Sequence, residues 1–153
     1  MQTAEVVASL SGMRPDLMPA LREIYLGQWE GLRTDELAGR FPEAWASWTL
    51  QPDWDLVPGG EGAAAFEARS WSAVETLLAR YPEGGDVLAV THGGVIQMAL
   101  YRILDRPSRG VFAFRIQNAS ITVIEKRDGR IVIDGVNDVG HLDPVLASKA
   151  GPA

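Results

Sequence analysis

The sequence predicts an α/β fold, a three-layer sandwich around a mostly parallel sheet, on three observations. Residues 86–91 form a short apolar run with β-branched side chains, which is typical of a buried strand. Helical periodicity precedes and follows this run, over 63–80 and 95–104. Two later runs, 120–125 and 130–136, are joined by Asp-Gly, a pair that favours a type I′ hairpin turn. Alternating strands and helices predict a sheet covered by helices, with an antiparallel element near the end.

The remaining elements follow from turn and cap residues. Thr34 is a good helix N-cap because its hydroxyl can accept a hydrogen bond from a free N–H of the first turn. Pro42 suits the first position of a second helix. The prolines and glycines of 51–62 indicate a loop. We therefore expect helices over 2–9, over 34–40 and from Pro42 onward, an extended segment over 20–29, a loop over 51–62 and a strand over 111–116.

The amino-acid composition limits the classes of protein to which this chain can belong. The chain has 153 residues, 46% of them hydrophobic, which suits one domain over 1–146 with a disordered tail at 147–153. The formal net charge of −6 argues against nucleic acid or an anionic membrane as partner. The absence of cysteine excludes a disulfide framework and favours the cytoplasm. No apolar run approaches the length of about 20 residues that spans a bilayer.

One of the two histidines lies where a site is expected. His92 ends the apolar run of 86–91, and Gly93 and Gly94 then open the following helix. Ligands of α/β sheets bind outside the carboxyl ends of strands, and the free N–H groups of a helix start favour an anion. The pattern predicts a phosphate site at His92, Gly93 and Gly94. The alternative is a histidine that caps the strand or packs in the core.

A second candidate is the loop at 21–31, which carries Glu23, Glu30 and Trp29. A carboxyl on such a loop can protonate a leaving group, and Trp29 is expected to be exposed. The alternative is a solvated acidic loop packed by Trp29. The tryptophans at 45, 48 and 54 are expected either to line a substrate mouth or to pack a small helical cap.

Six short motifs, taken in order, resemble the histidine phosphatase superfamily, whose fold is phosphoglycerate-mutase-like. The resemblance covers most of the chain. The motifs are Gln-Thr-Ala-Glu at 2–5, Leu-x-Glu-x-x-x-Gly-x-Trp-Glu-Gly at 21–31, Pro-Gly-Gly-Glu at 58–61 with Gly62 in place of the family's serine, Thr-His-Gly-Gly at 91–94, Asn-x-Ser at 118–120 and Asn-Asp-x-x-His-Leu at 137–142.

The resemblance implies phosphomonoester hydrolysis of a small phosphorylated metabolite through a phosphohistidine. His92 then matches the second, phosphate-binding histidine and Glu23 the acid, so both are candidate catalytic residues. Glu30 shapes the loop, and Arg22 and Trp29 are expected to line the substrate site. No metal and no cofactor is expected, because a cationic pocket stabilises the charge.

The sequence departs from the family at the nucleophile. The family's nucleophilic histidine lies in Arg-His-Gly, which this sequence lacks, and His141 fits the terminal His-Leu motif, for which we expect a structural role. Met1 stands inside the family's Arg-Ala-x-Gln-Thr-Ala motif, so we expect it to be an internal methionine and one or more N-terminal strands to be missing. A sheet without its central strand exposes backbone groups and an apolar slot. We therefore expect low stability or association, for example as a homodimer.

Two other functions stay open. Phosphoglycerate mutase is less favoured, because cofactor-dependent mutases usually carry a longer insertion than the short segment at 30–60. A non-catalytic phosphate-binding or interaction module is the other alternative, because this chain lacks the nucleophile.

Overall fold

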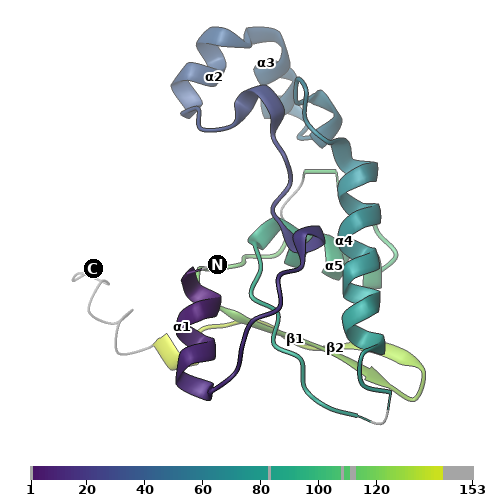
Figure 1. Cartoon of the computed structure of the whole chain (residues 1–153). Helices are drawn as coiled ribbons and strands as arrows, with labels where there is room; N and C mark the ends of the chain where they lie inside the picture. The colour runs from purple at the N-terminus through teal and green to yellow at the C-terminus, as the bar shows by residue number, and fades with distance from the viewer. Residues whose placement is uncertain (1, 83, 108, 111–112, 143–153) are drawn as a thin grey trace, which may run out of the picture.

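The computed structural model describes residues 2–82, 84–107, 109–110 and 113–142. Figure 1 shows two lobes joined by one long helix. Five α-helices and two strands lie in the described part: α1 Gln2–Ser11, α2 Thr34–Arg40, α3 Pro42–Leu50, α4 Gly62–Ala79, α5 Gly93–Ile103, β1 Ile121–Arg127 and β2 Arg130–Asp138. Short 3-10 turns lie at Pro19–Leu21, Gly27–Trp29, Trp54–Leu56 and Gly140–Leu142. We call the part with α2 and α3 the tryptophan lobe, and the part with α1, α5 and the two strands the lower lobe.

All the predicted helices form, with small changes at their ends. α1 runs two residues further than expected, to Ser11, and ends where Gly12 adopts a φ of 68°. The N–H of Met13 then bonds the carbonyl of Ala8 at 3.0 Å, as in a Schellman motif. Thr34 is the first residue of α2, not its N-cap. Arg33 holds the cap position, and its N–H donates to the Glu36 carboxylate at 2.8 Å.

The predicted hairpin is confirmed. β1 and β2 pair antiparallel, with Arg127 opposite Arg130 at the turn. The two turn residues, Asp128 and Gly129, have φ values of 51° and 75°. Two successive positive φ angles are what a type I′ turn requires, and this turn matches the right-handed twist of the strands.

The predicted mostly parallel sheet and three-layer sandwich are not formed by the described residues, whose sheet has only β1 and β2. Residues 86–91 form no strand, and Val87, Leu88 and Val90 are 40%, 64% and 41% exposed. A strand becomes regular and buried only when its backbone groups pair with a neighbour. Here the Thr91 hydroxyl donates to the Leu21 carbonyl at 2.7 Å, which ties this segment to the chain at 20–25 by a side chain.

The described part of the strand predicted over 111–116 is not formed either. Residues 111 and 112 lie outside the described part, and 113–116 belong to no strand. The Gln97 side chain from α5 takes the place of a strand partner. Its amide donates to the Phe114 carbonyl at 2.6 Å and accepts from the Phe114 N–H at 3.1 Å, so both backbone groups of Phe114 are paired.

One hydrophobic core runs through both lobes. In the tryptophan lobe, the Trp29 ring lies edge-on to Trp45 and Trp48, with centroids 5.8 and 5.5 Å apart, and Trp48 lies 4.9 Å from Trp54. Trp29 is only 5% exposed, so the expectation that it is exposed is wrong. The loop of Trp29 bends into the lobe because aromatic rings stabilise one another in edge contacts, by about 1 kcal/mol per pair beyond their burial.

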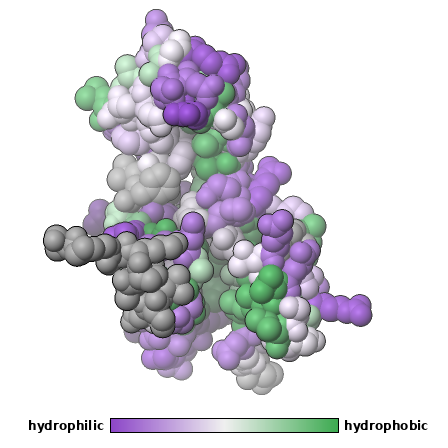
Figure 2. All heavy atoms as spheres, turned by 90° about the vertical axis from the view of Figure 1, so that its left-hand side faces the viewer, coloured by the Kyte–Doolittle hydropathy of each residue, from purple (hydrophilic) through white to green (hydrophobic). Residues whose placement is uncertain are grey.

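The surface of the lower lobe carries large hydrophobic side chains. Those of α1 and the chain after it include Val6, Leu10 and Leu17, which are 60%, 85% and 71% exposed. On β1, Ile121 and Val123 are 47% and 38% exposed. Figure 2 looks onto the face that carries α1 and shows hydrophobic residues at the surface of this lobe. Patches of this kind favour association.

Candidate functional site

The candidate site is built at the N-terminal end of α5. His92 is the N-cap residue, with extended backbone (φ −111°, ψ 160°), and its side chain is exposed. Its carbonyl accepts the first helical hydrogen bond, from Ile96 N–H at 3.1 Å. Gly93 and Gly94 are the first two helical residues. The chain therefore presents an imidazole and a helix start at the same point, as the sequence predicts.

A carboxylate already occupies part of this helix start. Gly94 N–H donates to Glu23 Oε2 at 3.1 Å, and Ile24 N–H donates to Glu23 Oε1 at 3.0 Å. A negative group is stabilised here by the free N–H groups and by the helix dipole. A Cβ on Gly94 would overlap the Glu23 carboxylate, so glycine is what lets the two approach. The N–H of Gly94, predicted to bind phosphate, is thus bonded to Glu23 in this structure.

Glu23 lies on the wall of an open hollow. The hollow is lined by Arg22, Glu23, Ile24, Tyr25, Leu26 and Glu30. The exposed Arg22 brings a cation to the same wall. Trp29 is not among these lining residues, because it is buried in the aromatic cluster.

The loop at 21–31 is held by the carboxylate of its own residue Glu30 and by hydrogen bonds to the loop at 58–62. Leu26 N–H donates to Glu30 Oε1 at 2.8 Å, so Glu30 shapes the loop, as expected. Gln28 N–H donates to the Pro58 carbonyl at 2.9 Å. Gly27 has a φ of 50°, and a Cβ there would overlap the backbone of Gly59. The two loops at 21–31 and 58–62 therefore pack backbone against backbone.

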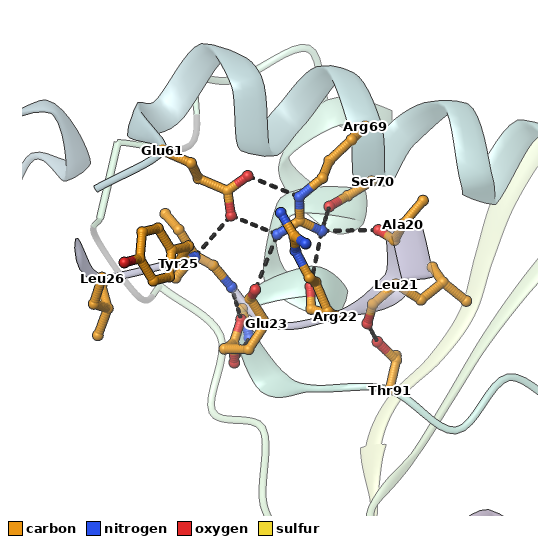
Figure 3. Close-up of polar contacts among 12 residues, drawn as sticks. Ala20, Leu21, Arg22, Glu23, Tyr25, Leu26, Glu61, Arg69, Ser70 and Thr91 are labelled. Atoms are coloured by element: carbon orange, nitrogen blue, oxygen red, sulfur yellow. Dashed lines mark hydrogen bonds and ion pairs between the residues drawn. The ribbon is translucent and has the colours of Figure 1, made fainter. Parts of the chain in front are cut away.

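An ion pair that the sequence analysis did not single out lies behind this loop (Figure 3). Arg69 of α4 bonds both oxygens of Glu61, and the side chains are 18% and 12% exposed. The Arg69 hydrogen bond is the main reason that the pKa of Glu61 lies below its ordinary value of 4.5, and the Tyr25 N–H lowers this pKa further, against the effect of burial. The pair holds α4 to the loop that carries Glu23.

Comparison with known proteins decides the family. A sequence model of the histidine phosphatase superfamily (branch 1) matches residues 1–139. The chain belongs to the histidine phosphatase superfamily. It is 35% identical over 129 residues to a metal-independent phosphoserine phosphatase of Arabidopsis thaliana, covering 84% of this chain and 52% of that protein. It is 29% identical over 140 residues to an adenosylcobalamin/alpha-ribazole phosphatase of Salmonella typhimurium, covering 88% and 66%.

Solved structures of similar proteins share the fold. The chain superimposes on Bacillus stearothermophilus YhfR with a TM-score of 0.80 and 30% identity, covering 92% of this chain and 70% of that one. A mycobacterial glucosyl-3-phosphoglycerate phosphatase solved with inorganic phosphate gives a TM-score of 0.73 and 29% identity, covering 89% and 70%. The chain spans about half to two thirds of the length of the curated relatives first matched.

The motif at 58–62 has Gly62 in place of the family's serine, and the local backbone conformation favours glycine at this position. Gly62, at the family's serine position, has a φ of 75° and opens α4. This backbone is unstrained for glycine and disfavoured for side chains with a Cβ. The helix start is capped from outside, because Asp55 Oδ1 accepts from Ala63 N–H at 2.8 Å. A Cβ on Gly62 would also lie 2.8 Å from this same oxygen.

Asn137, the first residue of the last motif, lies in β2 and bonds the residues that flank the Asn-x-Ser motif at 118–120. Asn137, with a φ of 57°, accepts from Gln117 N–H at 2.7 Å and donates its own N–H to the Thr122 hydroxyl at 3.3 Å. His141 lies in the turn Gly140–Leu142 and is exposed. Its structural role stays a prediction.

The residues that the structure describes hold no group of three or more His, Cys, Asp or Glu side chains suited to a metal ion. In that same part of the chain, no helix combines the length and the apolar character needed to cross a membrane. The predicted tail at 147–153 lies outside the described residues.

The sequence points to His92 and Gly94 because an apolar run ends there in His-Gly-Gly, and to Glu23 because it lies on an acidic loop that matches a family motif. It did not point to the Glu61–Arg69 pair, because Arg69 lies on a helix where a lone charge indicates a solvated face. The one available signal was Glu61, which ends the Pro-Gly-Gly-Glu motif.

Proposed function

We propose that this chain carries the acid and phosphate-binding residues of a phosphomonoester hydrolase of the histidine phosphatase type. Its substrate is a small phosphorylated metabolite, and the reaction passes through a phosphohistidine whose histidine is not one of this chain's residues. The observation that carries the proposal is the position of the Glu23 carboxylate, bonded to the start of the helix that His92 caps. The absence of Arg-His-Gly from the sequence supports the statement about the nucleophile.

Each residue has a defined task in this proposal. His92 and the N–H groups of Gly93 and Gly94 hold phosphoryl oxygens, because cations and free N–H groups stabilise a dianion. Arg22 adds a positive charge on the wall of the hollow. Glu23, in its protonated form, gives its proton to the leaving oxygen.

The names of the relatives support a phosphate monoester as substrate. They include a metal-independent phosphoserine phosphatase, an adenosylcobalamin/alpha-ribazole phosphatase and a glucosyl-3-phosphoglycerate phosphatase. A relative from Enterobacter sp., 29% identical over 148 residues, is described as a probable phosphoglycerate mutase. We favour hydrolysis over the mutase reaction because the segment at 30–60 is short.

A non-catalytic phosphate-binding module is the second candidate for this chain taken alone. It is favoured by one observation, that the two histidines, His92 and His141, both lie outside an Arg-His-Gly motif. The remaining expectations are that 1–146 form one domain, that the chain acts in the cytoplasm and that it pairs with a second copy. The exposed hydrophobic side chains of the lower lobe support pairing.

Phosphate binding and turnover test the proposal together. Binding of inorganic phosphate is measured by calorimetry on the chain, on His92→Ala and on His141→Ala, and hydrolysis is measured with p-nitrophenyl phosphate. We expect His92→Ala to abolish binding, His141→Ala to keep it, and no variant to hydrolyse the ester above background. Equal binding by His92→Ala and the unmodified chain would contradict the site. Turnover that disappears with His92→Ala would show that this chain supplies its own nucleophile.

A further inference from the structure

We propose that Arg69 is a positioning residue that holds the Glu23 carboxylate against the start of α5. The importance of this for catalysis rests on the proposed function, whereas the positioning itself can be measured without any reaction.

Arg69 reaches the loop from the middle of α4, fixed by its pair with Glu61. Its Nε donates to Glu61 Oε2 at 2.8 Å, and its Nη2 bonds Oε1. This two-bond contact fixes the plane of the guanidinium, which a single-point contact would not. Both side chains are largely removed from solvent, so water does not compete freely for the same hydrogen bonds.

The remaining N–H groups of Arg69 bind the backbone that leads to Glu23 (Figure 3). Nη2 donates to the carbonyl of Glu23 itself at 2.9 Å. Nη1 donates to the carbonyls of Ala20 and Arg22 at 2.8 and 2.9 Å. One side chain therefore holds three carbonyls within four residues, and one of them belongs to the candidate acid.

Glu61 fixes the other side of Glu23. Its Oε1 accepts from Tyr25 N–H at 2.7 Å, and its backbone N–H donates to the Tyr25 carbonyl at 3.1 Å. The loop is thus bonded before and after Glu23, which fixes the position of the Glu23 backbone. From this position the Glu23 side chain accepts from the Gly94 N–H at 3.1 Å. A carboxyl that transfers a proton must be held within hydrogen-bond reach of its target.

The Arg69→Lys variant tests the positioning of Glu23 separately from the positive charge at position 69. It keeps the positive charge near Glu61, but its single ammonium cannot bind a carboxylate at two points and three carbonyls together. Arg102→Lys is the matched control. Arg102 also makes an ion pair with a glutamate of α4, Glu67, at 3.5 Å, but it makes no contact with the Glu23 loop in the described structure.

The test is a pH titration of the Gly94 amide by ¹H–¹⁵N NMR, because this amide shift follows proton uptake by the carboxylate bonded to it. In the unmodified chain we expect one clear titration step, which Glu23→Gln removes and so assigns. We expect Arg69→Lys to lose at least half of the amplitude of this step, and Arg102→Lys to keep it. Circular dichroism of each variant reports helix content independently.

Retention of the full Gly94 step in a folded Arg69→Lys variant would overturn the proposal, even if its melting temperature fell. If Arg69→Lys does not fold, Glu61→Gln replaces it, because an amide keeps the Tyr25 contact and weakens only the guanidinium pair. A reduced step in Glu61→Gln supports positioning, and an unchanged step overturns it. Failure of the chain to bind phosphate would refute the proposed function. It would not change the result of the Gly94 titration, which tests the positioning by Arg69 alone.

Discussion

The N–H of Gly94 donates to the carboxylate of Glu23 at 3.1 Å, which joins a loop near the start of the chain to the helix that follows His92. The anion at this helix start is the protein's own. This contact couples the candidate acid and the candidate phosphate site, because both use the N–H of Gly94.

The fit between Gly94 and Glu23 predicts different effects of alanine at two neighbouring glycines. Gly94→Ala places a Cβ into the Glu23 carboxylate, whereas a Cβ on Gly93 meets Ile116 at an ordinary 3.9 Å. We expect Gly94→Ala to lower the free energy of unfolding by about 1–3 kcal/mol. Gly93→Ala should be neutral or slightly stabilising, since alanine favours helix by up to about 1 kcal/mol. Urea denaturation measures both, and equal effects would contradict the fit.

Removing the charge of Glu23 should strengthen phosphate binding by the isolated chain. Glu23→Gln keeps the shape of the side chain and takes away a negative charge beside the incoming dianion. Charges at a helix end contribute about 0.3–1 kcal/mol, so the dissociation constant for inorganic phosphate at pH 7 should fall about twofold to fivefold. Calorimetry measures this. Weaker binding by Glu23→Gln would mean that phosphate does not approach the start of α5.

In a polypeptide that also carries the nucleophilic histidine, Glu23→Gln should lower the turnover rate, although it strengthens phosphate binding. A general acid matters most when the leaving oxygen is strongly basic. The variant should therefore slow alkyl phosphates more than p-nitrophenyl phosphate. Steady-state rates on both esters measure the difference, and equal slowing would argue against Glu23 as the acid.

The Glu61–Arg69 pair predicts how stability depends on pH. Because the pKa of Glu61 lies below its ordinary value of 4.5 in the folded chain, the unfolded chain binds more protons in that range and stability rises with pH. The contribution is complete above pH 4.5 and is lost as the pH falls through the folded pKa. Glu61→Gln should show a shallower fall in the free energy of unfolding between neutral and acid pH than the unmodified chain. Glu75→Gln, at an exposed position of the same helix, is the control and should follow the unmodified chain.

The exposed segment at 86–91 predicts self-association through the lower lobe. Leu88 is 64% exposed there, and Leu50, on α3 in the tryptophan lobe, is 88% exposed. We expect Leu88→Glu to shift the chain toward monomer in sedimentation velocity, and Leu50→Glu to leave its distribution unchanged. A monomeric unmodified chain with a sharp, reversible thermal transition would contradict this prediction.

The sequence predicted local structure better than long-range pairing. The hairpin at Asp128 and the helices were predictable because caps, turns and periodicity act within a few residues. The parallel sheet was not, because a strand such as 86–91 depends on neighbours that the local pattern does not contain. For the candidate site, the position of His92 at a helix start was predictable from the His-Gly-Gly pattern, and the catalytic roles of His92 and Glu23 stay predictions. The contacts of Arg69 reach three carbonyls about 47 residues away along the chain, which no local pattern reveals.

The clustering of four of the five tryptophans in one lobe determines which part of the protein intrinsic fluorescence reports on. Trp29, Trp45, Trp48 and Trp54 lie in the tryptophan lobe, and the fifth tryptophan, Trp71, lies on α4 with Arg102 5.9 Å from its ring centre. Intrinsic fluorescence therefore follows one lobe almost alone, while circular dichroism follows helices in both. Melting curves that coincide by the two methods would show cooperative unfolding of the whole chain, and curves that separate would show that α4 joins two parts that melt independently.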